Sequence, residues 1–166
     1  MPLRIAEAGV EDLPEIAAIY GAAAGTPATF DLEARPVSAW QAALAASDAD
    51  RGNLLLSALD GERTVGFAKS TIHKERPGYS TTRETSVYIA EDRRGRGIGG
   101  LLYGALLERL DGIGLRLAVA GVTQPNPASD RLHLAHGFTE VGVFRGVGVK
   151  LGRAWDVRWY QRPLEP

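Results

Sequence analysis

Four glycines and three arginines fall within eight residues and form the most informative stretch of this sequence. They are Arg93, Arg94, Gly95, Arg96, Gly97, Gly99 and Gly100. Glycines leave backbone N–H groups uncovered, so these groups can close on an anion, and guanidinium groups add positive charge around it. Where such a turn begins a helix, the helix dipole also favours negative charge. The stretch therefore predicts a turn that binds a pyrophosphate.

Three classes of motif bind phosphates with a glycine-rich turn, and this stretch fits them unequally. A Walker A loop ends in Gly-Lys-Ser/Thr, which is missing here. Residues 95–100 match the dinucleotide fingerprint G-x-G-x-x-G, but the strand expected at 117–122 carries no acidic residue to hold a ribose. The third pattern, Q/R-x-x-G-x-G/A, is met by Arg94, Gly97 and Gly99. The turn thus resembles the acetyl-CoA pyrophosphate loop of the GNAT acetyltransferases.

The residues around the loop predict a strand, a helix and a second strand. Residues 86–89 favour a strand, and apolar residues recur at helical spacing over 98–113. Gly112 and Gly114 are expected to end this helix. The short apolar run at 117–122 is typical of a buried strand parallel to the first. Together they form one β-α-β crossover.

The rest of the chain predicts antiparallel strands and further helices around this crossover. The expected elements are a strand at 3–6, a helix from Leu13 to Tyr20, a helix capped by Ser38 and ending near Ala46, a hairpin of 54–59 with 64–68, a short helix over 125–134, and two antiparallel strands at 139–149 and 154–162. Residues 21–30 form a flexible stretch that could make one wall of a pocket. We predict a single α/β (α+β) domain over 1–166, with a mixed, mostly antiparallel central sheet and flanking helices.

Composition narrows the classes of function. The 166 residues are 45% hydrophobic and 23% charged, with a net charge of −1, which argues against a nucleic-acid or membrane surface. The absence of Cys excludes disulfides, thiolate metal sites and a cysteinyl-acyl intermediate, and three scattered His give no metal signature. The N-terminus does not resemble a signal peptide, so a cytoplasmic protein is expected.

A wider resemblance covers almost the whole chain and concerns the phosphinothricin and methionine sulfoximine N-acetyltransferase branch of the GNAT superfamily. The matching stretches are 19–20, 28–30, 76–79, 84–89, 94–99, 126–138, 148–152, 155–157 and 161–162. The resemblance implies the GNAT fold, acetyl-CoA as co-substrate without a metal, and acetyl transfer to the amino group of a small amino-acid-like acceptor. It also suggests a homodimer. Without Cys, direct attack in a ternary complex is the simplest route.

The resemblance also implies roles for individual residues. Glu84, just upstream of the loop, stands where the family places its general base, and its carboxylate could accept the ammonium proton of the acceptor. Alternation places it on one polar face with Thr82, Ser86 and Tyr88, so a solvated strand-edge charge is the other interpretation. His133 matches a Leu-His of the family and is a candidate acid for the leaving thiolate, or else a wall of the pocket.

Two groups of residues are expected to bind the cofactor and the acceptor. The cofactor group is Val87, Tyr88 and Ile89 through their backbone, the loop residues Arg94, Gly95, Arg96, Gly97, Ile98, Gly99 and Gly100, and Asn126 with Ser129, which match the family's Asn-x-x-Ser and could equally cap a short helix. The acceptor group is Phe30, Lys74, Arg76, Tyr79, Glu84, Thr85, Ser86 and Val149.

Two positions in the acceptor group depart from the family. A cation at Lys74 or Arg76 could pair with the carboxylate of an amino-acid acceptor. Lys74 stands where the family usually has Arg, and Lys is a point charge that cannot clamp a carboxylate with two parallel bonds. Val149 stands where the family often has an aromatic residue. Trp155 and Trp159 are expected to be packing residues.

Three alternatives remain open at this stage. The protein could be an acyl-CoA-binding sensor of the same fold without useful catalysis. It could be a GNAT enzyme that acts on peptides or other amines. The literal glycine fingerprint also leaves a nicotinamide-dinucleotide-binding domain as a weaker possibility.

Overall fold

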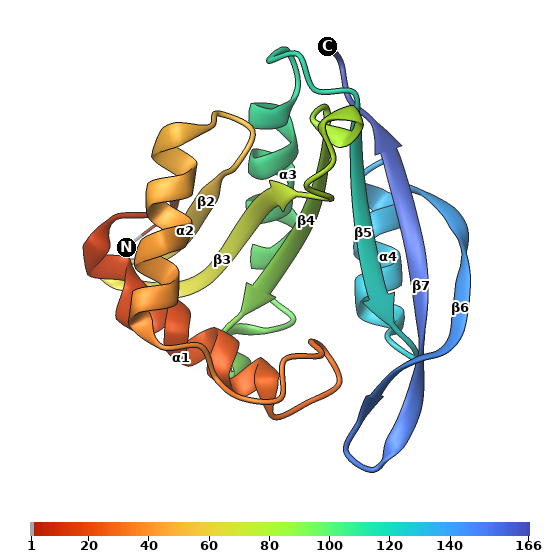
Figure 1. Cartoon of the computed structure of the whole chain (residues 1–166). Helices are drawn as coiled ribbons and strands as arrows, with labels where there is room; N and C mark the ends of the chain where they lie inside the picture. The colour runs from red at the N-terminus through yellow and green to blue at the C-terminus, as the bar shows by residue number, and fades with distance from the viewer. Residues whose placement is uncertain (1) are drawn as a thin grey trace.

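Seven strands form one sheet in the order β1-β2-β3-β4-β5-β7-β6 in the computed structural model, which describes residues 2–166 (Figure 1). The strands are β1 (Leu3–Glu7), β2 (Leu55–Asp60), β3 (Arg63–Ile72), β4 (Thr82–Ile89), β5 (Leu117–Thr123), β6 (Thr139–Lys150) and β7 (Arg153–Pro163). In this part of the chain, β4 with β5 is the one parallel pair. The predicted mixed, mostly antiparallel sheet with one parallel crossover is confirmed.

Helices cover both faces of this sheet. On one face lie α1 (Leu13–Ala24) and α2 (Val37–Ala49), and on the other α3 (Ile98–Leu110) and α4 (Pro127–Ala135) (Figure 1). The side of α3 that faces the sheet is a stripe of i, i+4 residues, namely Ile98, Leu102, Leu106 and Leu110, all buried. Leu101, expected on that stripe, is instead 61% exposed. It lies three positions after Ile98, on the edge of the stripe that turns away from the sheet.

The second helix differs from its prediction at both ends. It begins at Val37 with Pro36 as N-cap, so Ser38 lies inside the first turn and does not cap it. Proline in the extended conformation at the N-cap sets the direction of entry, and its carbonyl accepts from Ala39 N–H at 3.0 Å. The helix runs on to Ala49 rather than Ala46, because Asp48 and its neighbours are tolerated in a solvent-facing last turn.

The sheet opens between β4 and β5, and this opening positions the site. The two strands pair at only three positions, from Thr82 with Leu117 to Glu84 with Val119. Beyond Glu84, β4 stays paired with β3 and β5 stays paired with β7, so the two halves of the sheet diverge (Figure 1). One edge of β4 after Glu84 therefore has no strand partner, and its backbone groups can bind something else.

Candidate active site

Two cavities meet at the opening between β4 and β5. We call the first, of about 540 Å³, the polar cavity, because Tyr20, Asp31, Arg35, Lys69 and Glu84 line it. We call the second, of about 660 Å³, the glycine-loop cavity, because residues 93–95 and 97–99 form part of its wall. The residues that line both are Ala28, Thr85, Ser86, Tyr88, Gly121 and Thr123. Two molecules held in these cavities would come into contact at β4.

Most of the predicted cofactor residues lie around the glycine-loop cavity. They are Val87, Tyr88, Ile89, Arg94, Gly95, Gly97, Ile98, Gly99, Asn126 and Ser129. The two exceptions are Arg96, which is exposed, and Gly100, whose carbonyl lies 3.0 Å from Nε2 of His136. The structure thus brings the strand, the loop and the start of α4 together, although the chain separates them.

The backbone of the loop explains two of its glycines. Gly95 and Gly97 have φ of +74° and +78°, in the left-handed region that other residues adopt only with strain. Gly97 is also the N-cap of α3, so its left-handed conformation fixes where the helix begins. Arg94 Nε donates to the carbonyl of Ile89 at 3.3 Å and ties the loop to the end of β4. The first turn of α3 therefore faces the cavity with free N–H groups, as an anion requires.

The start of α4 confirms that Asn126 caps a short helix, which is one of the two interpretations given to Asn126 and Ser129. Asn126 Oδ1 accepts a hydrogen bond from the backbone N–H of Ser129 at 3.2 Å, so Asn126 caps the helix. Both residues also lie on the cavity wall, which leaves a cofactor contact as a prediction.

His133 lies on the same cavity but deep in the packing of the protein. It is 4% exposed, and its Nδ1–H donates to the carbonyl of Ser129 at 2.7 Å. Its ring stacks on Tyr160 at 5.3 Å and meets Tyr103 and Phe138 edge-on. Burial lowers the pKa of His133 below its ordinary value. A neutral imidazole with Nδ1–H bound to a carbonyl has no proton on Nε2, so this geometry favours the pocket-wall interpretation.

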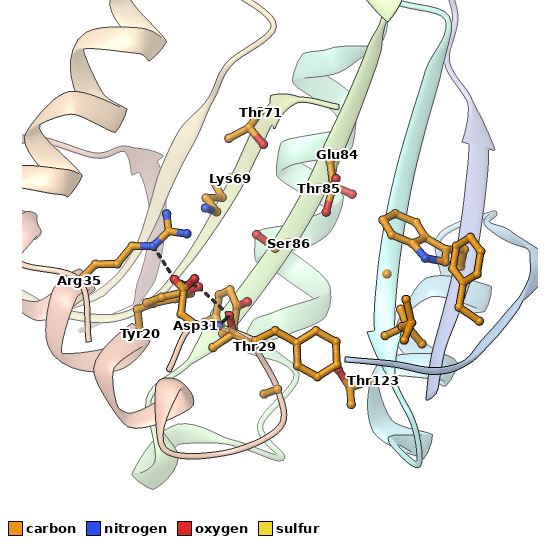
Figure 2. Close-up of a pocket in the computed structure, with 18 residues that line it drawn as sticks. Tyr20, Thr29, Asp31, Arg35, Lys69, Thr71, Glu84, Thr85, Ser86 and Thr123 are labelled. Atoms are coloured by element: carbon orange, nitrogen blue, oxygen red, sulfur yellow. Dashed lines mark hydrogen bonds and ion pairs between the residues drawn. The ribbon is translucent and has the colours of Figure 1, made fainter. Parts of the chain in front are cut away.

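Glu84 lies at the point where the sheet opens. It is the last β4 residue paired with β5, and its side chain lines the polar cavity on the same face as Ser86 and Tyr88, as the alternation predicts (Figure 2). The side chain is 43% exposed, and Oε2 lies 3.3 Å from Nδ1 of His73. A carboxylate that reaches both the cavity and water is suited to accept a proton directly or through a water molecule.

A hydrogen-bonded network that the sequence did not predict forms the opposite wall. Tyr20 Oη donates to Asp31 at 2.7 Å and lies 2.7 Å from the hydroxyl of Thr29, while Arg35 Nε binds Asp31 at 2.5 Å (Figure 2). This guanidinium holds the pKa of Asp31 below its usual range. Lys69 lines the same cavity from β3. The one signal in the sequence was the small, flexible stretch 21–30, which does supply Ala28 to Phe30 as a wall.

Four residues expected to bind the acceptor do not line either cavity. They are Lys74, Arg76, Tyr79 and Val149. Lys74 Nζ lies 5.1 Å above the ring of Tyr79, and that ring lies 6.0 Å from His73, which in turn touches Glu84. Lys74 and Tyr79 therefore lie next to the Glu84 end of the polar cavity, outside its wall. The other expected acceptor residues, Phe30, Glu84, Thr85 and Ser86, do line the polar cavity.

A bulge in β6 supplies the apolar wall that was expected from Val149. Residues 145–147 bulge out opposite Asp156, whose carboxylate accepts from Gly146 N–H and from Arg145, both at 2.8 Å. Phe144 and Val147 are three positions apart and would point to opposite faces of a regular strand, yet both line the polar cavity. Val149 is 72% exposed. Trp159 lines the polar cavity and Trp155 the glycine-loop cavity, so neither tryptophan is a packing residue alone.

Residues 16–138 match the model of the Acetyltransferase (GNAT) family, and this match covers more than half of the chain. The chain belongs to this family.

This GNAT acetyltransferase is similar along most of its length to proteins with more specific names. It is 43% identical to a phosphinothricin N-acetyltransferase of Streptomyces coelicolor over 93% of this chain and 92% of the relative. It is 37% identical to an L-methionine sulfoximine/L-methionine sulfone acetyltransferase of Pseudomonas aeruginosa over 100% of this chain and 97% of that relative. The crystal structure of a GNAT superfamily phosphinothricin acetyltransferase from Sinorhizobium meliloti, in complex with acetyl-CoA, superimposes with a TM-score of 0.93 at 29% identity, covering 99% of this chain and 90% of that one.

Three further observations concern metal binding, membrane spanning and dinucleotide binding in this GNAT protein. Within residues 2–166, no group of His, Asp and Glu side chains could hold a metal ion. None of the helices in that range is long and apolar enough to cross a membrane. The mostly antiparallel sheet also differs from the doubly wound parallel sheet on which dinucleotide fingerprints act, which argues against the nicotinamide-dinucleotide alternative.

Proposed function

We propose that this protein transfers the acetyl group of acetyl-CoA to the amino group of a small amino-acid-like acceptor of the phosphinothricin, methionine sulfoximine or methionine sulfone type. The observation that carries the proposal is the meeting of the polar cavity with the glycine-loop cavity at β4, beside Glu84. The names of the two relatives support the class of acceptor, and the acetyl-CoA complex of the S. meliloti protein supports the co-substrate.

Acetyl-CoA fits the glycine-loop cavity by the chemistry of its walls. The left-handed Gly95 and Gly97 and the free N–H groups of α3 suit its pyrophosphate. The pantetheine arm carries amides that can pair with the unpartnered edge of β4, as an added strand does, between Thr85 and Ile89. This places the thioester where the two cavities meet, with N–H groups of β4 available to its carbonyl oxygen.

The residues of the polar cavity then carry out the proton transfer. Glu84 takes a proton from the acceptor ammonium, directly or through water, and the neutral amine attacks the thioester carbonyl. The C–S bond breaks as the new C–N bond is completed, the attacking nitrogen loses its extra proton, and the coenzyme A thiolate leaves and takes up one proton, so that the products are the amide and the free thiol. We propose direct attack in a ternary complex for two reasons. The two cavities share wall residues of β4, so both substrates can be bound side by side, and the chain has no Cys to form an acyl-enzyme.

Thiol release from acetyl-CoA tests the proposal. The panel contains L-phosphinothricin, L-methionine sulfoximine, L-methionine sulfone, common free amino acids, polyamines and short peptides. We expect turnover with the first three compounds well above that with the rest. Turnover confined to peptides or polyamines would contradict the acceptor class, and binding of acetyl-CoA without any turnover would favour the sensor alternative.

A binding measurement separates the cofactor alternatives. Acetyl-CoA is expected to raise the melting temperature, because a ligand that binds the folded state stabilises it, and NAD or NADP is expected to leave it unchanged. The reverse result would contradict the assignment of the loop.

We also propose that the protein forms a homodimer and acts in the cytoplasm. Sedimentation velocity tests the first proposal directly: a species of twice the chain mass of 17.7 kDa is expected. Cell fractionation tests the second.

A further inference from the structure

Lys69 lines the polar cavity and has no hydrogen-bond or ion-pair partner of its own among the residues that the structure describes. It lies on β3, where it pairs with Ser86 of β4, two positions along from the pair of Thr71 with Glu84 (Figure 2). In residues 2–166 its ammonium has no hydrogen bond or ion pair. Nζ instead lies over the rings of Trp40 and Tyr20, at 5.5 and 6.0 Å from their centroids.

The other charges of the polar cavity already have partners. Arg35 is bound to Asp31, and Glu84 is in contact with His73. Burial, and next the nearby Arg35, lower the pKa of Lys69, so its charged form is held at a cost. An anion that enters the cavity would stabilise this half-buried ammonium strongly, because its hydrogen bonds and opposite charge replace the hydration that the ammonium lost on burial.

We propose that Lys69 binds the carboxylate of the acceptor while Glu84 receives its amino group; this rests on the proposed function. The pairs of Lys69 with Ser86 and of Thr71 with Glu84 are separated by two residues, or about 7 Å along the strands. The flexible stem of lysine allows its ammonium to approach an α-carboxylate whose amino group is next to Glu84. Lys69 would therefore select α-amino acids over amines without a carboxylate, the role that the sequence suggested for Lys74 and Arg76.

Steady-state kinetics with a matched pair of acceptors test this role. L-Methionine sulfoximine and its carboxamide differ only in the carboxylate. Lys69→Met keeps an unbranched apolar side chain at this position and removes the charge that lies over Trp40. We expect it to raise the KM for the acid about 10- to 100-fold, with little change in kcat, in the KM for acetyl-CoA or in turnover of the carboxamide. Lys69→Arg is expected to recover part of the loss.

The controls separate binding of the carboxylate from general effects of charge. Arg51 is an exposed cation in the α2–β2 turn, and Arg51→Met is expected to behave as wild type. An equal loss on acid and carboxamide in Lys69→Met would mean that Lys69 only shapes the cavity, and would overturn the proposal. A selective loss on the acid in Lys74→Met, with none in Lys69→Met, would also overturn it.

A second measurement does not depend on activity. The chain has only three lysines, Lys69, Lys74 and Lys150, so the ε-methylene signals of ¹³C-lysine-labelled protein can be assigned with Lys69→Arg. We expect L-methionine sulfoximine, and not its carboxamide, to shift the Lys69 signal. If no amino-acid acceptor is turned over, the proposed function fails, while this titration still decides the role of Lys69. An unmoved Lys69 signal with both the sulfoximine and L-phosphinothricin would overturn it.

Discussion

The ammonium of Lys150 donates to the backbone carbonyls of Thr29 at 2.7 Å and of Asp31 at 2.6 Å, across more than 115 positions of sequence. Lys150 ends β6 and is only 5% exposed, and Thr29 and Asp31 belong to the loop between α1 and α2. This contact ties the two sides of the polar cavity together, because β6 supplies Phe144 to the wall opposite that loop. The shape of the cavity therefore depends on a residue that does not line it.

Replacing Lys150 by Met is expected to loosen this loop. Two carbonyls lose a charged donor in a buried position, so we expect the free energy of unfolding to fall by about 1–3 kcal/mol. The KM for the acceptor is expected to rise while the KM for acetyl-CoA changes little, because Thr29 and Asp31 line the polar cavity and not the glycine-loop cavity. Urea unfolding and steady-state kinetics check both effects, with Arg51→Met as control. Equal changes in the two KM values would contradict the tie to one cavity.

Glu84→Gln tests the proposed base. Glutamine keeps the size of the side chain but cannot accept the ammonium proton, so we expect kcat to fall by about 10²- to 10⁴-fold. The Kd of acetyl-CoA, measured by calorimetry, is expected to stay within error of wild type because Glu84 does not line the glycine-loop cavity. Glu75→Gln, at an exposed position in the β3–β4 loop, is the matched control. Undiminished turnover in Glu84→Gln would remove this residue as the base.

The fold could be predicted from the sequence because its signals are local. Alternation over β4 and the i, i+4 stripe of α3 depend on residues a few positions apart, and so does the glycine loop between them. The errors lie where local rules compete. Ser38 has the chemistry of a cap, but Pro36 sets the start of α2, and Leu101 has the chemistry of the core but lies beyond the buried stripe.

The sequence predicts most of the wall of the glycine-loop cavity but only part of the wall of the polar cavity, namely Phe30 and residues 84–86 of β4. The walls of the polar cavity come from β3, from the α1–α2 loop and from a bulge in β6, and no periodic pattern links these segments. Phe144 and Val147 share a wall because Asp156 holds the bulge between them. Lys69 stands in a strand with no special motif, and the role proposed for it follows from its place in the cavity, where its ammonium has no hydrogen bond or ion pair with any of residues 2–166. The prediction of Lys74 rests on its position in the sequence alone, and the loop that carries it leaves it outside the wall.

Gly97→Ala tests the backbone of the loop. Gly97 has φ of +78°, and no atom lies within 4 Å of where a Cβ would stand, so the substitution meets strain rather than a clash. The left-handed conformation costs other residues about 1–2 kcal/mol, and a relaxed loop would no longer aim its N–H groups at a pyrophosphate. We expect a small fall in melting temperature and a Kd for acetyl-CoA about tenfold higher by calorimetry.

Gly78→Ala is the control for that loop variant, because this glycine also faces open space but has no left-handed backbone. It is expected to match wild type in both measurements. Equal effects of the two alanines would mean that the conformation of Gly97 has no special role.

The last prediction concerns the pH dependence of stability and follows from the burial of His133. Its pKa in the folded protein lies below the ordinary value of 6.5, which the unfolded chain is expected to have. As the pH falls below about 6.5, the unfolded chain takes up a proton that the folded protein refuses, so stability decreases. The pKa of Asp31 is also lowered, chiefly by Arg35, but it acts at a more acidic pH. We therefore expect the melting temperature to fall between about pH 6.5 and pH 5.

His133→Gln isolates this contribution, because the amide can still donate to the carbonyl of Ser129 but does not titrate. At pH 8 the variant is expected to melt at a lower temperature than wild type, because the stack of the imidazole on Tyr160 is missing. Between pH 8 and pH 5 its melting temperature is expected to depend less on pH than that of wild type. The same protein tests the predicted acid role: a pocket-wall residue leaves the alkaline limb of the pH–kcat profile in place, whereas loss of the acid removes it. If the melting temperature of the variant changes with pH as much as that of wild type across this range, the result would contradict a buried neutral imidazole at His133.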